Sequence, residues 1–190
     1  MKALLATIAL ATLASAAFAE SATYSVDPTH TGVTFEVVHV GTSTLRGRFD
    51  KKEGSVQFDR AARTGKVDIT IDTTSIDTGV PALDKHLSSP DFFNAAQNPT
   101  AHFVGDKFVF KGDKVSEVAG TLTMMGKTQP VTLKASNFNC YDSPLFKREV
   151  CGGDFETTIQ RSQWGMSYGL VYGVPDNVHL LVQIEAVKQQ

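Results

Sequence analysis

The chain has 190 residues, enough for one domain with a sizeable core, and its formal net charge is −2. Its charged residues, 20% of the total, are scattered rather than grouped in blocks. This composition excludes an electrostatic basis for binding nucleic acid or anionic lipid headgroups, so we expect no nucleic-acid partner.

Residues 1–19 read as a secretory signal peptide. Lys2 supplies a basic start, an apolar run follows to about residue 14, and Ala17-Phe18-Ala19 fits a small-x-small cleavage site. We expect cleavage after Ala19, a single mature domain over 20–190, and a periplasmic location, with an uncleaved anchor as the alternative. No later stretch approaches the roughly 20 apolar residues of a membrane span, so we expect a soluble chain without stable membrane insertion.

Between residues 24 and 39 apolar and polar side chains alternate, which predicts a first strand in a sheet with one wet face. Thr34 and Glu36 occupy the polar face. The apolar face carries Val33, Phe35, Val37 and His39.

The same alternation recurs along the chain. It predicts further strands at 43–49, 55–59, 66–72, 100–104, 107–110, 115–125, 128–138, 155–161, about 166–171 and 178–187. Between 73 and 98 the pattern breaks, and a short helix within 77–87, ending before Pro90, is expected to form a lid or side cover. Taken as eight or nine antiparallel strands, since some of these short segments can belong to one strand, and with one short helix, the pattern predicts an all-β fold, an eight-stranded barrel that covers its own apolar face.

Cys140 and Cys151 flank a polar segment that we expect to form a loop between two strands. In an oxidising compartment so close a pair predicts a disulfide, worth about 3 kcal/mol in the chain-entropy description. A redox or metal-binding pair is disfavoured because the spacing is not Cys-x-x-Cys and the segment contains no His.

Several segments, taken in order along nearly the whole mature chain, resemble the YceI family of bacterial periplasmic proteins. They include Tyr24-x-Val26-Asp27-Pro28-x-His30-Thr31, Gly47-x-Phe49, Asp84-Lys85-His86-Leu87, Gly120-Thr121-Leu122-Thr123-Met124 and Arg161-Ser162-x-Trp164-Gly165. The resemblance implies a lipocalin-like barrel associated with binding polyisoprenoids. Trp164 stands where the family usually has Phe, which keeps an aromatic ring at that position.

The resemblance also implies an elongated apolar cavity in the barrel. The expected wall residues are Phe35, Val37, Phe49, Phe92, Phe93, Phe103, Leu122, Met124, Phe155, Ile159, Trp164, Met166, Leu180 and Val182. An eight-stranded barrel either fills with side chains or leaves room for one small ligand, and the sequence alone leaves both open. For the polar end of a ligand, the expected donors at the mouth are Arg161, His30 and His86.

Motifs for catalysis or cofactor binding are missing from the sequence. The five histidines form neither His-x-His nor His-Glu-x-x-His, and Gly-x-Ser-x-Gly and glycine-rich phosphate loops do not occur. We therefore expect no metal, no cofactor and no catalytic residues. Asp27 and His30 could form a dyad, but Asp-Pro-x-His at a strand start favours a turn whose carboxylate accepts backbone donors.

Together these features predict a periplasmic, non-enzymatic protein that holds a polyisoprenoid or a similar long amphiphile, such as a quinone. Each isoprene unit could contribute roughly 3 to 4 kcal/mol gross on leaving water. One alternative is an interaction or stress protein with a filled barrel and an exposed apolar patch. The other is a lipid- or quinone-modifying enzyme using Asp27, His30 or Arg161. The oligomeric state stays open, because an unpaired edge strand would allow a homodimer.

Overall fold

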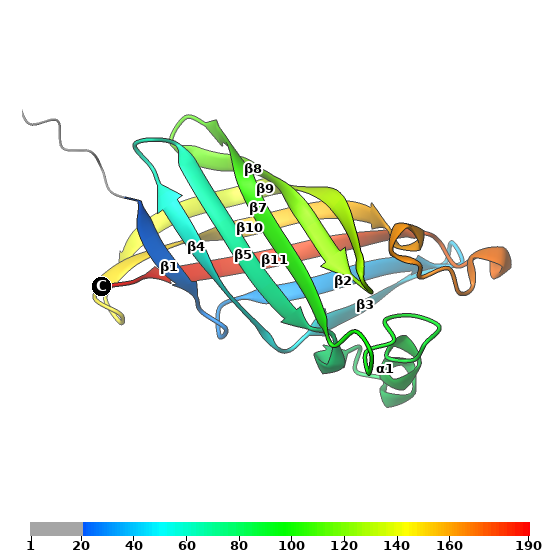
Figure 1. Cartoon of the computed structure of the whole chain (residues 1–190). Coiled ribbons are helices and arrows are strands. Elements are labelled where there is room, and N and C mark those ends of the chain that lie inside the picture. Colours follow the sequence, from blue (N-terminus) through cyan, green and yellow to red (C-terminus); the bar gives the residue numbers. More distant parts are fainter. Residues whose placement is uncertain (1–20) are drawn as a thin grey trace, which may run out of the picture.

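The computed structural model describes residues 21–190, so the predicted signal peptide and its cleavage site lie outside the described residues. Strands form most of the described chain (Figure 1). They are β1 (Ala22–Val26), β2 (Gly32–His39), β3 (Ser43–Phe49), β4 (Lys52–Asp59), β5 (Thr64–Asp72), β6 (Ile76–Asp77), β7 (Thr100–Lys111), β8 (Lys114–Met124), β9 (Lys127–Ser143), β10 (Arg148–Gln160) and β11 (Asn177–Lys188). The short helical elements are α1 (Pro81–Leu87) and the 3-10 turns η1 (Thr73–Ser75), η2 (Arg161–Trp164) and η3 (Leu170–Tyr172).

The strands close into one antiparallel barrel. Neighbours follow the order β1-β4-β5-β7-β8-β9-β10-β11, and β11 returns to β1. Strands β2, β3 and β6 continue β1, β4 and β5 toward the other end: β2 pairs with β11, β3 with β2, and β6 with β3. Each of the consecutive strand pairs β1/β2, β3/β4 and β5/β6 therefore acts as one bent strand of the barrel. The predicted eight-stranded antiparallel barrel with one short helix is confirmed.

The strand expected over 24–39 is broken by a turn between β1 and β2. Pro28 has no N–H to donate to a ladder, and the Asp27 carboxylate accepts the backbone N–H of Thr29 at 2.9 Å. The alternation predicted beyond the turn is correct, since Val33 and Phe35 are buried while Thr34 and Glu36 are not. The turn bends the chain between β1 and β2, and both strands pair with β11.

Two strand predictions were wrong. The segment 166–171 forms no strand, because positive φ angles at Gly165 and Gly169 turn the chain there and η3 follows. The strands expected at 100–104 and 107–110 are one strand, β7, with a register shift between Gly105 and Lys107. A β-bulge there absorbs the irregularity that read as a break in the sequence.

The expected loop between the cysteines is mostly strand. β9 continues to Ser143 and β10 begins at Arg148, so Cys140 and Cys151 are direct cross-strand partners. The predicted disulfide joins them. It therefore connects two neighbouring strands near the end of the barrel where the C-terminus lies (Figure 1).

Helix α1 begins at Pro81, in the first helical turn where a missing N–H is tolerated, and ends at Leu87 as the sequence predicts. Together with residues up to Asn98 it covers the barrel end opposite the C-terminus (Figure 1). Within residues 21–190, no helix has the length and apolar character needed to cross a bilayer.

Candidate ligand-binding cavity

A cavity of about 460 Å³ occupies the interior of the barrel. Its lining extends from Tyr24 and Phe58 at one end to His86 and Tyr168 at the other. This volume lies within the range of small-molecule sites. The barrel is therefore not filled by its own side chains, which counts against the filled-barrel alternative.

The end of the cavity near the C-terminus is closed by aromatic rings around Phe58, which is buried. Its ring centroid lies 5.7 Å from that of Phe138, 6.1 Å from Phe110 and 6.5 Å from Tyr24. These rings come from four different strands, so they tie the strands together and leave an apolar floor.

The opposite end is the mouth. Most lining side chains are buried or half-buried, and the exposed ones are His39, Leu45, Arg46 and Tyr168. His39, Leu45 and Arg46 belong to the β2–β3 hairpin, while Tyr168 belongs to the segment 165–175 that follows η2. Exposure of the lining at this end alone places the opening between the hairpin, helix α1 and segment 165–175.

The structure gathers nearly all predicted wall residues on the cavity. Those lining it are Phe35, Val37, Phe49, Phe92, Phe93, Phe103, Leu122, Met124, Phe155, Ile159, Met166, Leu180 and Val182. Trp164 is placed elsewhere: it is 1% exposed, does not line the cavity, and donates its indole N–H to the Leu122 carbonyl at 3.0 Å. The expectation for Trp164 is corrected, because its N–H needs a buried acceptor that the apolar wall does not provide.

Sequence reasoning missed several wall residues. Val67, Ile69 and Ile71 of β5 line the cavity, as do Val131 and Leu133 of β9. Their alternation was visible, and pairing the apolar face of every predicted strand with the barrel interior would have found them.

Gly47 provides space for the cavity wall. A Cβ added there would lie 2.3 Å from Phe35 Cζ and 2.9 Å from Thr78 Cγ2. Only glycine at this point of β3 leaves room for the Phe35 ring, which accounts for Gly47 in the Gly47-x-Phe49 motif.

Arg161 lies at the mouth and is buried, with 4% exposure. Its guanidinium donates to the carbonyls of Met166 (2.7 Å), Val174 (3.4 Å) and Pro175 (3.0 Å), and it lies 5.7 Å from the centroid of the Phe92 ring. Burial lowers the pKa of Arg161, and the nearby Asp176 charge opposes this. A largely desolvated cation thus stands where the cavity meets solvent.

The Phe92 ring beside this cation belongs to a cluster of three rings. His86 of α1 contacts Phe92 and Tyr168 edge-on, with centroids 5.0 and 5.1 Å apart, and Phe92 lies 5.5 Å from Tyr168. His86 and Arg161 therefore occupy the same mouth, as the sequence suggested for these two residues.

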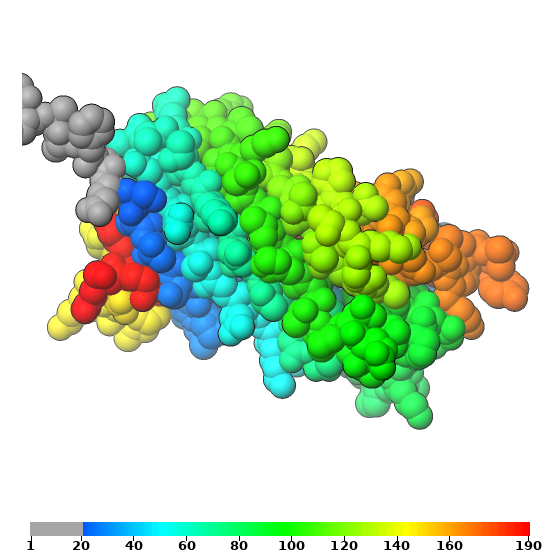
Figure 2. All heavy atoms as spheres, viewed as in Figure 1, coloured from blue at the N-terminus to red at the C-terminus, as the bar shows by residue number. Residues whose placement is uncertain are grey.

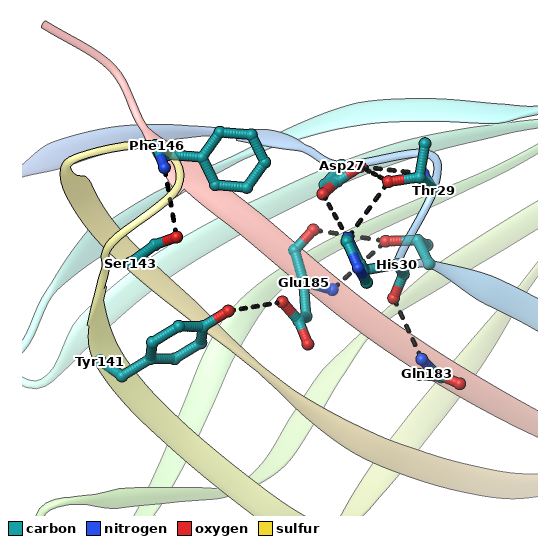
Figure 3. Close-up of polar contacts among 9 residues, drawn as sticks. Asp27, Thr29, His30, Tyr141, Ser143, Phe146, Gln183 and Glu185 are labelled. Carbon is teal, nitrogen blue, oxygen red and sulfur yellow. Dashed lines mark hydrogen bonds and ion pairs between the residues drawn. The ribbon is translucent and has the colours of Figure 1, made fainter.

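His30 is not on the cavity. It lies in the exposed turn between β1 and β2, where its Nδ1 is 2.7 Å from Asp27 Oδ2 (Figure 3). Burial raises the pKa of Asp27, but hydrogen bonds from Thr29 and His30 outweigh it and lower the pKa to about 2. The hydrogen bond and charge of Asp27 raise the pKa of His30. The placement of His30 at the mouth was wrong, and the favoured turn geometry is present.

One group among the described residues has the spacing of metal ligands: Cys140, Glu149 and Cys151. Both sulfur atoms are joined in the disulfide. Glu149 also accepts a hydrogen bond from the Tyr24 hydroxyl at 2.5 Å. Burial, and after it this hydrogen bond, raises the pKa of Tyr24. The disulfide and the Tyr24–Glu149 hydrogen bond thus link strands at the closed end of the barrel.

The closed barrel with its internal apolar cavity defines a lipocalin-like fold, the class of small β-barrels built around a binding site. The sequence profile of the YceI-like domain matches residues 24–186, and the chain belongs to this family. A UPF0312 protein of Pseudomonas aeruginosa is 35% identical over 190 residues, covering 96% of this chain and 98% of the relative.

Two solved structures are similar to the barrel. The crystal structure of Burkholderia cenocepacia BcnA is 26% identical with a TM-score of 0.71, covering 85% of this chain and 99% of BcnA. A polyisoprenoid binding domain from Saccharophagus degradans is 15% identical with a TM-score of 0.64, covering 90% of this chain and all of that domain. At this identity the second match shows the fold alone.

Proposed function

We propose that this protein binds a polyisoprenoid or a similarly long amphiphile, such as a quinone, in its barrel without changing it chemically. The apolar cavity of about 460 Å³, open at one end, carries this proposal. Transfer of an isoprene unit from water to such a wall would contribute roughly 3 to 4 kcal/mol gross before ordering costs. The family, and the similar fold of a domain named for polyisoprenoid binding, support the same ligand class.

The ligand would enter tail first, with its polar end at the mouth. Arg161 uses three of its five N–H groups on backbone carbonyls, so two remain for a hydroxyl, carbonyl or phosphate of the ligand. His86 adds a second polar group from α1. Because both side chains pack against Phe92, they would be positioned before the ligand arrives.

The same proposal places the protein in the periplasm. The signal-peptide pattern at 1–19 and a disulfide, which persists in oxidising compartments, support this location. The location is tested by fractionating cells that express the full chain. The proposal expects a protein that starts at Glu20, identified by N-terminal sequencing, in the periplasmic fraction.

Ligand binding is tested with geranylgeraniol as the probe. Purified detergent-free protein is incubated with radiolabelled probe, and co-elution is measured by gel filtration, alongside native mass spectrometry of the protein as isolated. V182W places an indole inside the cavity and should reduce uptake at least tenfold. V109W is the control, because Val109 is 49% exposed on β7. Absence of uptake by the unmodified protein, or equal uptake by V182W, would contradict the proposal.

A further inference from the structure

Exposed apolar side chains gather around the mouth of the cavity. The β2–β3 hairpin contributes Val38, Val40 and Leu45, and segment 165–175 contributes Tyr168, Val171 and Tyr172. Val171 is 86% exposed and Tyr172 is 78% exposed. We call these six residues the tip.

The tip projects beyond the barrel. Segment 165–175, orange in Figures 1 and 2, extends past the strand ends at the side away from the C-terminus. It lies next to the hairpin, since a Cβ built on Gly173 would be 3.7 Å from Val40 Cγ1. The apolar side chains of the two segments therefore form one continuous surface.

This surface lacks charged residues. Residues 165–175 contain no Asp, Glu, Lys or Arg, and neither do residues 37–45, in a chain that is 20% charged. Charged side chains flank these segments: Arg46 Nε lies 2.6 Å from Glu36 Oε1, and Asp176 accepts hydrogen bonds from the backbone N–H and hydroxyl of Ser162. Lys127 Nζ lies at the base of segment 165–175, 3.0 Å from the position of a Cβ on Gly165. Such a surface can enter a medium of low dielectric constant without desolvating an ion.

The backbone of the tip is held in place. Gly169 and Gly173 have φ angles of 78° and 86°, and the Gly169 carbonyl accepts the N–H groups of Tyr172 and Val174 at 3.0 and 3.1 Å. Arg161 fastens both ends of the segment through its hydrogen bonds to the carbonyls of Met166 and Pro175. Contact with a partner would therefore cost little ordering of the chain.

The tip is continuous with the cavity. Leu45 and Tyr168 belong to the tip and also line the cavity. An apolar chain leaving a surface pressed against the tip would reach the cavity along the Leu45 and Tyr168 side chains.

We propose that the tip is a reversible docking surface for the lipid bilayer from which the ligand is taken or to which it is delivered. Valine side chains would enter the acyl boundary, while the Tyr168 and Tyr172 hydroxyls stay at headgroup level, where amphipathic rings are favoured. A second copy of the chain is less suited to this surface, because a stable dimer needs a broad self-complementary face of about 800 Å² on each partner, whereas the tip is a narrow projection. The reason for docking rests on the proposed function, because the bilayer would supply or receive the ligand. Binding to the bilayer can be tested without the ligand.

The test is sedimentation with large vesicles of phosphatidylcholine. V171S/Y172S removes apolar surface without adding charge. It should lower the vesicle partition coefficient, calculated from the sedimented fraction, at least tenfold. L145S is the control, because Leu145 is 77% exposed on the β9–β10 turn at the opposite end of the barrel. Uptake of geranylgeraniol from solution, measured on the same samples, should be unchanged in both variants, whereas transfer from vesicles should slow at least tenfold in V171S/Y172S.

The outcomes separate the two proposals. If the unmodified protein and V171S/Y172S sediment equally, the docking surface is overturned whatever the uptake shows. If the unmodified protein forms a dimer that V171S/Y172S abolishes and neither sediments, a second copy covers the tip and the proposal is again overturned. If sedimentation depends on the tip but no variant takes up geranylgeraniol, docking stands and the ligand assignment fails.

Discussion

Asp27 is buried in the turn between β1 and β2, and its hydrogen bonds from Thr29 and His30 hold its pKa at about 2. An unfolded Asp has a pKa near 3.9, so the unfolded chain binds a proton between about pH 4 and pH 2 that the folded chain does not. Stability contributed by Asp27 is therefore present above about pH 4 and lost as the pH falls toward 2. We predict that D27N flattens this acid limb and lowers the free energy of unfolding at pH 6 by about 1.5 to 3 kcal/mol.

The measurement is denaturant unfolding of both proteins at a series of pH values. H30Q is the companion variant: the raised pKa of His30 contributes stability below about pH 6.5 that is lost as the pH rises through its folded pKa. H30Q should remove that neutral-pH change and keep most of the acid limb. An acid limb equally steep in D27N would show that other carboxylates dominate it.

Gly47 controls the position of the Phe35 ring. Because a Cβ there would lie 2.3 Å from Phe35 Cζ, G47A must push the ring toward the cavity. We predict a loss of about 1 to 3 kcal/mol in the free energy of unfolding, the usual cost of overpacking, and weaker uptake of geranylgeraniol. Thermal unfolding and the gel-filtration assay measure the two effects, with G32A, where no atom lies within 4 Å, as the control. Equal stability and equal uptake in G47A and G32A would mean that the Phe35 ring can move away from residue 47 without cost.

Among single residues, the sequence distinguished apolar wall positions better than polar ones. Alternation along a strand fixes which face a residue such as Leu180 occupies, and that face became the cavity wall. His30 and Arg161 carry no such periodic signal. The positions of His30 in the β1–β2 turn and of Arg161 at the end of β10 depend on strand pairing, which one sequence does not reveal.

The disulfide is a feature of the β9–β10 pair. Cys140 and Cys151 are 11 residues apart and opposite each other in the ladder. Closing so short a loop stabilises by about 3 kcal/mol, so C140A/C151A should unfold about 6 to 12 °C lower than the unmodified protein. Calorimetry in the presence of a thiol reductant is the control, since reduction should shift only the unmodified protein. An unchanged Tm would show that the ladder alone holds these strands.

At the level of elements, predictions failed where glycine or proline overrode the hydrophobic pattern. Apolar residues between Met166 and Val171 read as a strand, but Gly165 and Gly169 turn the chain into the tip. Pro28 divides the first strand for a related reason. The short helix, by contrast, was predictable from Pro81 at its start and the loss of alternation around it.

The whole molecule has two unlike ends, a floor closed by rings around Phe58 and a mouth with an uncharged tip. The barrel was predictable because the number of alternating segments fits closure and the resemblance agrees with it. The cavity was not, because whether side chains fill an eight-stranded barrel depends on the volumes that meet inside it.

An open cavity makes the stability of the whole barrel depend on its ligand. A molecule that binds only the folded state stabilises it by about 2.7 kcal/mol at 100 times its Kd, which corresponds to a Tm increase of about 5 to 11 °C for a domain of this size. We predict this shift when detergent-free protein is heated with geranylgeraniol. V182W should show no ligand-dependent shift, because its indole already occupies the interior, while V109W should respond like the unmodified protein. Equal shifts in V182W and V109W would locate the binding on the outer surface instead of in the barrel.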